Sequence, residues 1–426
     1  MKELFEILKE SKASDFLIRQ TNTTSQEVFF IGKKLDMGRA KDVTHTTVTV
    51  YVDSEDKQFR GSATKEIHPT STKEEMQKEI EKAIFAASFV KNPWYPVVNP
   101  SESAENNIKD DTDVDLTAEL IKITKAMQNV QSGENEKLNS FEIFVNKSKT
   151  HIMNSKGVDV SFGGWDCEIE AVINTSKDGH EIELIKVFKF ADKSAEEITA
   201  DVEKMFESGR SRLEAVPTKQ NEHATVLLTG DDVPGFFNYF AAHTNASNQY
   251  MGVAKAKLNE KMTGEEADDL TMVVKPSMEG STKNNPYDTD GNPVKEVTLF
   301  ENGVCKSFWG SVQHAHYIQL EETTSINNVI VSGGSMSVEE MKKVPHLEIT
   351  DFSAFVMDPV SGNFGGEIRL GYESDGEHIH PVVGGSLSAN YAKIVKNIKF
   401  SKETRQLNQY IVPCAVLISD VVIAGE

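Results

Sequence analysis

The chain has 426 residues, of which 38% are hydrophobic and 26% charged, and its formal net charge is -21. That length exceeds one typical hydrophobic core, so two domains are expected. The acidic balance argues against direct nucleic-acid binding, because a general phosphate-backbone binder needs clustered Lys and Arg. No apolar run is long enough for a transmembrane helix, and the three scattered cysteines do not form a disulfide framework. We therefore expect a cytoplasmic protein without a membrane anchor.

The first 130 residues alternate helix and strand patterns. A short helix over residues 1–12 precedes four short strands, and Thr72 with Glu75 fits the capping box of a second helix. Residues 101–115 are acidic and poor in apolar groups, so a solvated loop is predicted there before a third helix over 116–130. The four predicted strands are Phe16–Arg19, Val28–Ile31, Thr46–Val52 and Gln58–Thr64.

A meander of five short strands is predicted between Ser140 and Phe190. Its turns fall at Lys156-Gly157, Gly163-Gly164 and Asp178-Gly179. A helix capped by Ser194 and Glu197 follows, and the polar connection over 216–223 separates two predicted domains, 1–215 and 224–426. The predicted strands are Glu142–Val145, His151–Met153, Val158–Phe162, Glu168–Asn174 and Glu181–Phe190.

The second domain opens with a buried strand over 224–229 and one helix over 234–244. Further strands and Gly-rich turns then dominate, and Asn302-Gly303 suits a type I′ hairpin turn. We expect an α+β fold with an N-terminal α/β domain, which holds an antiparallel sheet and helices, and a β-rich, barrel-like C-terminal domain. The later predicted strands are Met272–Lys275, Val297–Phe300, Leu347–Met357, Gly366–Glu373, Val382–Leu387 and Val416–Gly425.

Several segments in this order resemble one known family. They are Asn154-Ser155-Lys156-Gly157, the Pro234-Gly235 helix start, the Pro-Asp-Gly loop that leads to Glu301-Asn302-Gly303, and the terminal strand Val416–Gly425, which resembles the family's Val-Ala-Gly ending. Their order and spacing resemble the TldD/TldE (PmbA) family, the so-called modulators of DNA gyrase, regarded as a two-subunit bacterial metallopeptidase system. The resemblance is clearest over 140–165 and 224–426, whereas the first 70 residues match less well.

The resemblance also predicts whether this chain can bind zinc. In the catalytic subunits, Pro-Gly leads into a His-Glu-x-x-x-His helix, and the aligned positions here are Tyr239, Phe240 and Thr244. These side chains cannot hold zinc with a carboxylate base beside it. The family's zinc-binding cysteine is also missing from Lys402–Tyr410. The resemblance thus implies a TldE-type subunit with no catalytic or metal-binding residues, no cofactor of its own and zinc only in its partner.

Other histidines are weaker candidates. His314 with His316 and His378 with His380 are each two residues apart, a spacing that on a strand points both imidazoles to one face. Because neither pair lies near a Glu–His helix, we interpret both as exposed or edge histidines. His243, one residue from a zinc-ligand position, is either a polar residue of a groove or a partly exposed helical histidine.

The leading hypothesis is a non-catalytic TldE/PmbA-like subunit that binds unfolded peptide and channels it to a TldD-like zinc protease. Whether this chain is an enzyme by itself stays open. The alternatives are an independent metal-dependent hydrolase with an unrecognised site, including His378 and His380, and a homodimeric peptide-binding or scaffold protein.

Overall fold

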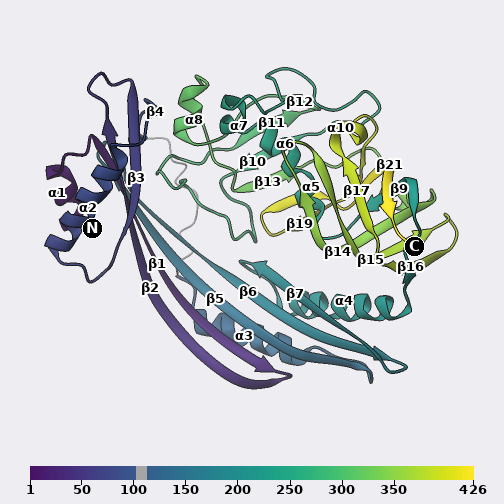
Figure 1. The fold of residues 1–426 in the computed structure, drawn as a ribbon. Helices are drawn as coiled ribbons and strands as arrows, with labels where there is room; N and C mark the ends of the chain where they lie inside the picture. The colour runs from purple at the N-terminus through teal and green to yellow at the C-terminus, as the bar shows by residue number, and fades with distance from the viewer. Residues whose placement is uncertain (102–112) are drawn as a thin grey trace.

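A computed structural model of the chain describes residues 1–101 and 113–426 (Figure 1). Most of the acidic loop predicted over 101–115 lies outside the described residues. None of the described helices is both long and apolar enough to cross a bilayer. The described helices are α1 (Lys2–Glu10), α2 (Lys73–Ala87), α3 (Leu116–Asn129), α4 (Ala195–Glu214), α5 (Val233–Phe236), α6 (Asn238–His243), α7 (Ala246–Tyr250), α8 (Val312–Tyr317), α9 (Val338–Met341) and α10 (Tyr391–Ile394).

The strands divide between a long N-terminal sheet and the C-terminal half of the chain (Figure 1). The N-terminal strands are β1 (Asp15–Ile31), β2 (Lys34–Asp53), β3 (Phe59–Ile67), β4 (Asn92–Pro93), β5 (Glu136–Asn154), β6 (Asp159–Lys177) and β7 (His180–Phe190). The C-terminal strands are β8 (Val216–Pro217), β9 (Asn221–Leu228), β10 (Met272–Lys275), β11 (Val297–Glu301), β12 (Val304–Cys305), β13 (Asn328–Val331), β14 (His346–Met357), β15 (Asn363–Ser374), β16 (Ile379–Val383), β17 (Ser386–Asn390), β18 (Lys399–Phe400), β19 (Thr404–Leu407), β20 (Tyr410–Pro413) and β21 (Val416–Ala424).

The N-terminal sheet has the order β4-β3-β2-β1-β5-β6-β7, and its neighbouring strands pair antiparallel. Its central strands are far longer than predicted, with 17 residues in β1 and 19 in β6. The predicted breaks at 146–150 and at Gly163-Gly164 are wrong. Ladder pairing on both sides of β5 carries that strand through its polar stretch, where Thr150 and Ser148 also bond to hydroxyls on β1.

Two helices cover one face of this sheet. α3 and α4 pack on each other and on the sheet, burying Ile123 and Val202 against Ile143 and Ile169. The capping boxes predicted for α2 and α4 are confirmed, because both reciprocal bonds form at Thr72 with Glu75 and at Ser194 with Glu197. α4 also contacts β15 and β16, so it joins the sheet to the C-terminal half of the chain (Figure 1).

The C-terminal half contains a closed five-stranded barrel, which confirms the predicted fold class. The ring runs β14-β9-β21-β17-β15 and closes through the pairing of β15 with β14. A second sheet, with the order β12-β11-β10-β13-β20-β19, shares its core. The strand predicted over Val382–Leu387 is in fact two strands, because Gly384 and Gly385 turn the chain with φ of 77° and 71°.

The single helix predicted over 234–244 is also corrected, because it is divided into α5 and α6. At the junction the Phe237 amide bonds to the Pro234 carbonyl at 3.1 Å, the tighter spacing of a 3₁₀ turn. This turn lets two consecutive aromatic side chains be buried. Phe236 packs on Tyr391, while Phe237 packs on Phe400.

Candidate functional site

Aromatic rings occupy the place where α5 and α6 meet the barrel. Tyr239 stacks on Tyr391, with ring centroids 4.1 Å apart and ring planes within 5° of parallel. The Tyr391 hydroxyl donates to the Phe236 carbonyl at 3.0 Å, and Phe240 meets the Tyr391 ring edge-on. We call Phe236, Tyr239, Phe240 and Tyr391 the aromatic cluster. It fixes the irregular α5–α6 segment onto the core of the barrel.

The positions aligned with the family's His-Glu-x-x-x-His motif belong to this packing. Phe240 is fully buried and also packs edge-on against Phe300. Thr244 is equally buried, and its hydroxyl lies 3.0 Å from the Ala241 carbonyl, which can accept its proton. Tyr239 is 4% exposed, and its hydroxyl lies 3.2 Å from the Lys255 ammonium. These residues do not fit a zinc ion. Tyr239 and Phe240 are packed rings, and the hydroxyl of Thr244 is hydrogen-bonded within its own helix.

His243 is fully buried, so the expectation of a partly exposed histidine is wrong. Its Nδ1 accepts the Lys255 backbone N–H at 3.2 Å, which places the proton of the neutral ring on Nε2. Nε2 has no hydrogen-bond partner among the described residues, and the imidazole lies edge-on to the Tyr239 ring. Burial, with a smaller effect from the Lys255 charge, lowers the pKa of His243 to about 4. The imidazole is therefore neutral at neutral pH.

The other candidate histidines do not converge on one site. His314 and His316 lie on α8, so the strand spacing considered for them is wrong, and residues two apart on a helix do not face each other. The side chains of His378 and His380 are 83% and 46% exposed and lie beside Asp375 and Glu373. Within residues 1–101 and 113–426, no three His, Cys, Asp or Glu side chains are grouped so that they could hold a metal ion.

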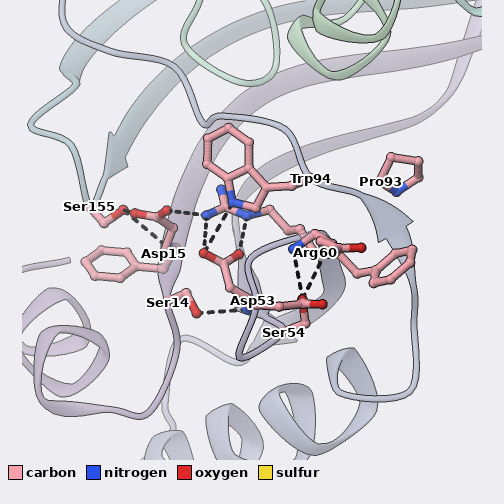
Figure 2. A network of polar contacts seen from close by, with 12 residues as sticks. Ser14, Asp15, Asp53, Ser54, Arg60, Pro93, Trp94 and Ser155 are labelled. Carbon is pink, nitrogen blue, oxygen red and sulfur yellow. Dashed lines mark hydrogen bonds and ion pairs between the residues drawn. The ribbon is translucent and has the colours of Figure 1, made fainter.

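A buried ionic cluster that was not predicted from the sequence lies in the N-terminal sheet (Figure 2). Arg60 is 2% exposed, and it donates to Asp15 at 2.8 Å and to Asp53 at 2.6 Å. The Trp94 ring lies 5.0 Å from its guanidinium carbon, and the Ser155 hydroxyl donates to Asp15 at 2.6 Å. We call these five residues the Arg60 cluster. It joins β1, β2 and β3 to the segment after β4 and to the turn between β5 and β6.

Electrostatics explains why this cluster is stable. Burial alone would raise the pKa of Asp15, but hydrogen bonds from Ser155 and Lys156 and the charge of Arg60 outweigh burial and lower it. The only sequence signal was Ser155, which lies in the Asn-Ser-x-Gly segment of the family resemblance. Nothing local marked Asp15, Asp53 or Arg60 as members of a buried cluster, because each is a single charge at or next to a strand end, where charged residues are usually exposed.

A cavity of about 450 Å³ lies between the N-terminal sheet and the loop after β10. We call it the β6 cavity. Over Asp159–Asp166, β6 pairs with β5 on one edge, and in the described part of the chain no strand pairs with its other edge. The cavity is lined by Ser148, Thr150, Phe162, Gly163, Gly164, Trp165, Asp166, Ala191, Ser277, Met278, Glu279, Ser281, Thr282, Asn284 and Asn285.

Residues 221–425 match the family model of the PmbA/TldA metallopeptidase C-terminal domain. This part of the chain is a C-terminal domain of the TldD/PmbA family. The match covers the barrel, the second sheet and the aromatic cluster, so the aligned zinc positions lie within the matched domain.

Several solved structures share the fold of this chain along its full length. The crystal structure of TldE from Thermococcus kodakarensis matches with a TM-score of 0.76 at 19% identity and covers 100% of both chains. A candidate modulator of a DNA gyrase from Thermotoga maritima matches with a TM-score of 0.78 at 18% identity, covering 99% of this chain and 98% of the other. An uncharacterized protein of Methanocaldococcus jannaschii is 22% identical over 188 residues, which span 40% of this chain and 43% of that relative.

Proposed function

We propose that this chain is a TldE-type subunit that performs no hydrolysis itself. It binds unfolded peptide and passes it to a zinc-bearing, TldD-like partner in the cytoplasm. The observation that carries the proposal is that Tyr239, Phe240 and Thr244 occupy the three positions aligned with the His-Glu-x-x-x-His motif and are all buried.

Catalytic zinc needs nitrogen, sulfur or carboxylate ligands that converge at about 2.0–2.3 Å, together with an open coordination position for water. Here the corresponding space is taken by the stack of Tyr239 on Tyr391 and by the ring of Phe240. Restoring a metal site would require these rings to leave the core. Because that rearrangement would uncover a large apolar area, the observed packing favours a permanently non-catalytic helix.

The proposal is tested by mixing the full chain with the His-Glu-x-x-x-His relative from the same organism and following cleavage of carboxymethylated casein. We expect cleavage by the mixture that a chelator abolishes, and none by this chain alone at any zinc concentration. Matched amounts of the partner alone show how much the chain contributes. Chelator-sensitive cleavage by the isolated chain would falsify the proposal.

A further inference from the structure

We propose that an extended peptide binds in the β6 cavity by adding a strand to the open edge of β6 at Phe162–Asp166. This inference rests on the proposed peptide-binding function and assigns it a site. The ligand is any unfolded segment that can take up the extended conformation, because recognition comes mainly from its backbone.

The edge is open because β7 is shorter than β6. The last ladder pair of the two strands joins Phe190 to Cys167, and the chain then turns away, with the Ala191 amide 3.4 Å from the Gly280 carbonyl. Between Asp159 and Asp166, no strand of the described residues pairs with β6 at the edge along which β7 would continue. An unpaired edge presents alternating N–H and C=O groups, which are the groups that pair with another extended chain.

Glycine leaves room at the same place. A Cβ built on Gly164 would meet no atom within 4 Å, and this glycine lies within a continuous strand. Neither a turn nor crowding therefore requires glycine here. Glycine inside a strand is typical of sites where a ligand or a second backbone approaches closely. Gly163 and Gly164, which the sequence suggested as a turn, thus line the cavity where a peptide would lie.

The size and chemistry of the cavity suit a single extended chain of varied sequence. Five residues of β6 give an edge of about 16 Å at about 3.3 Å per residue. The opposite wall is formed by hydroxyl, amide and thioether side chains, including Ser281, Asn285 and Met278. Asp166 and Glu279 are its charged residues, so basic peptides are favoured over acidic ones. A second folded copy is a poorer occupant, because its own β6 edge lies beside its own loop.

The test measures fluorescence anisotropy of a fluorescein-labelled peptide, Lys-Val-Thr-Val-Thr-Val-Lys, with the full chain. Gly164→Phe adds a ring at a cavity-lining position where a Cβ meets no atom within 4 Å, and it should weaken binding at least about tenfold. Gly38→Phe, on the exposed part of β2, should not. The same peptide methylated on alternate backbone nitrogens should bind as weakly, since it cannot complete the ladder. Amide hydrogen exchange over 159–166 should slow when the unmodified peptide is bound.

Each outcome decides a different point. If the wild-type chain binds the peptide but Gly164→Phe binds it equally well, the β6 site is wrong while peptide binding stands. If the methylated peptide binds as tightly as the unmodified one, strand addition is wrong. If Gly164→Phe changes the oligomeric state in gel filtration instead, the occupant is a second copy. No binding to wild-type protein overturns both this inference and the peptide-binding function.

Discussion

The Arg60 cluster and the aromatic cluster perform the same structural task with opposite chemistry. Each fixes an irregular segment to a sheet: the residues around Trp94 in the N-terminal half, and α5–α6 in the C-terminal half. The first uses a buried cation between two carboxylates, and the second uses stacked rings with one hydroxyl bond. A charge cluster fails when one member is removed, because its partners are left uncompensated, whereas a ring cluster loses contact area in proportion to what is cut away.

The largest effect is expected from Tyr391→Ala, which breaks the aromatic cluster at its centre. Tyr391 is fully buried and contacts the rings of Phe236, Tyr239 and Phe240. The cavity and the lost hydroxyl bond should lower the free energy of unfolding by about 5 kcal/mol in urea titrations. Tyr391→Phe keeps the ring and should lose only about 1 kcal/mol. Equal losses for the two variants would mean that the stack contributes little.

Arg60→Met breaks the other cluster and should lower the free energy of unfolding by about 3 kcal/mol, because Asp53 loses its cation and buried Asp15 keeps only the exposed Lys156. Combining it with Asp15→Leu and Asp53→Leu should recover most of that loss, since the only charge then left without its partner is that of the exposed Lys156. The measurement is the urea midpoint of both proteins. A triple variant less stable than the single one would show that the charges themselves, and not their mutual compensation, stabilise this region.

The pH dependence of the stability tests the buried environment of His243, which lies beside the aromatic cluster. Its folded-state pKa of about 4 lies below the ordinary value of 6.5, so the fold keeps the imidazole neutral. The protein therefore keeps its full free energy of unfolding, as far as His243 is concerned, above about pH 6.5. It loses part of that free energy as the pH falls toward 4, since the unfolded chain then binds the proton more readily. Relative to His243→Phe, the wild-type protein should lose about 3 kcal/mol between pH 7.5 and pH 4. Parallel stability curves for the two proteins would contradict the buried neutral assignment.

Asp288 tests what happens to a half-buried carboxylate that has no arginine beside it. Burial, with a smaller effect from the charge of Asp290, raises its pKa to about 6, the reverse of Asp15. A raised carboxyl pKa means that the fold gains stability as the pH falls through 6. Asp288→Asn should therefore stabilise the protein by about 2 kcal/mol at pH 8 and change little near pH 4, as thermal unfolding at both values would show. Destabilisation at pH 8 would indicate a cation partner for the carboxylate.

The features predicted correctly from the sequence are those determined by neighbouring residues. Thr72 with Glu75 and Ser194 with Glu197 lie within one helical turn, so their capping boxes could be recognised locally. The lengths of β5 and β6 could not, because polar residues at 146–150 remain in the strand through pairing with β1, more than a hundred residues away. Arg60 was missed for the same reason, since Asp15 and Trp94, which surround its guanidinium, lie in distant segments of the sequence. The β6 edge depends on where β7 ends in space.

The most direct test of the account is the fate of peptide bound to the isolated chain. Full-length protein is incubated with zinc and the labelled peptide, the complex is separated, and the peptide is weighed by mass spectrometry. The account predicts intact peptide that stays with the protein whether or not a chelator is present. Shortened peptide whose formation stops when zinc is chelated would contradict it.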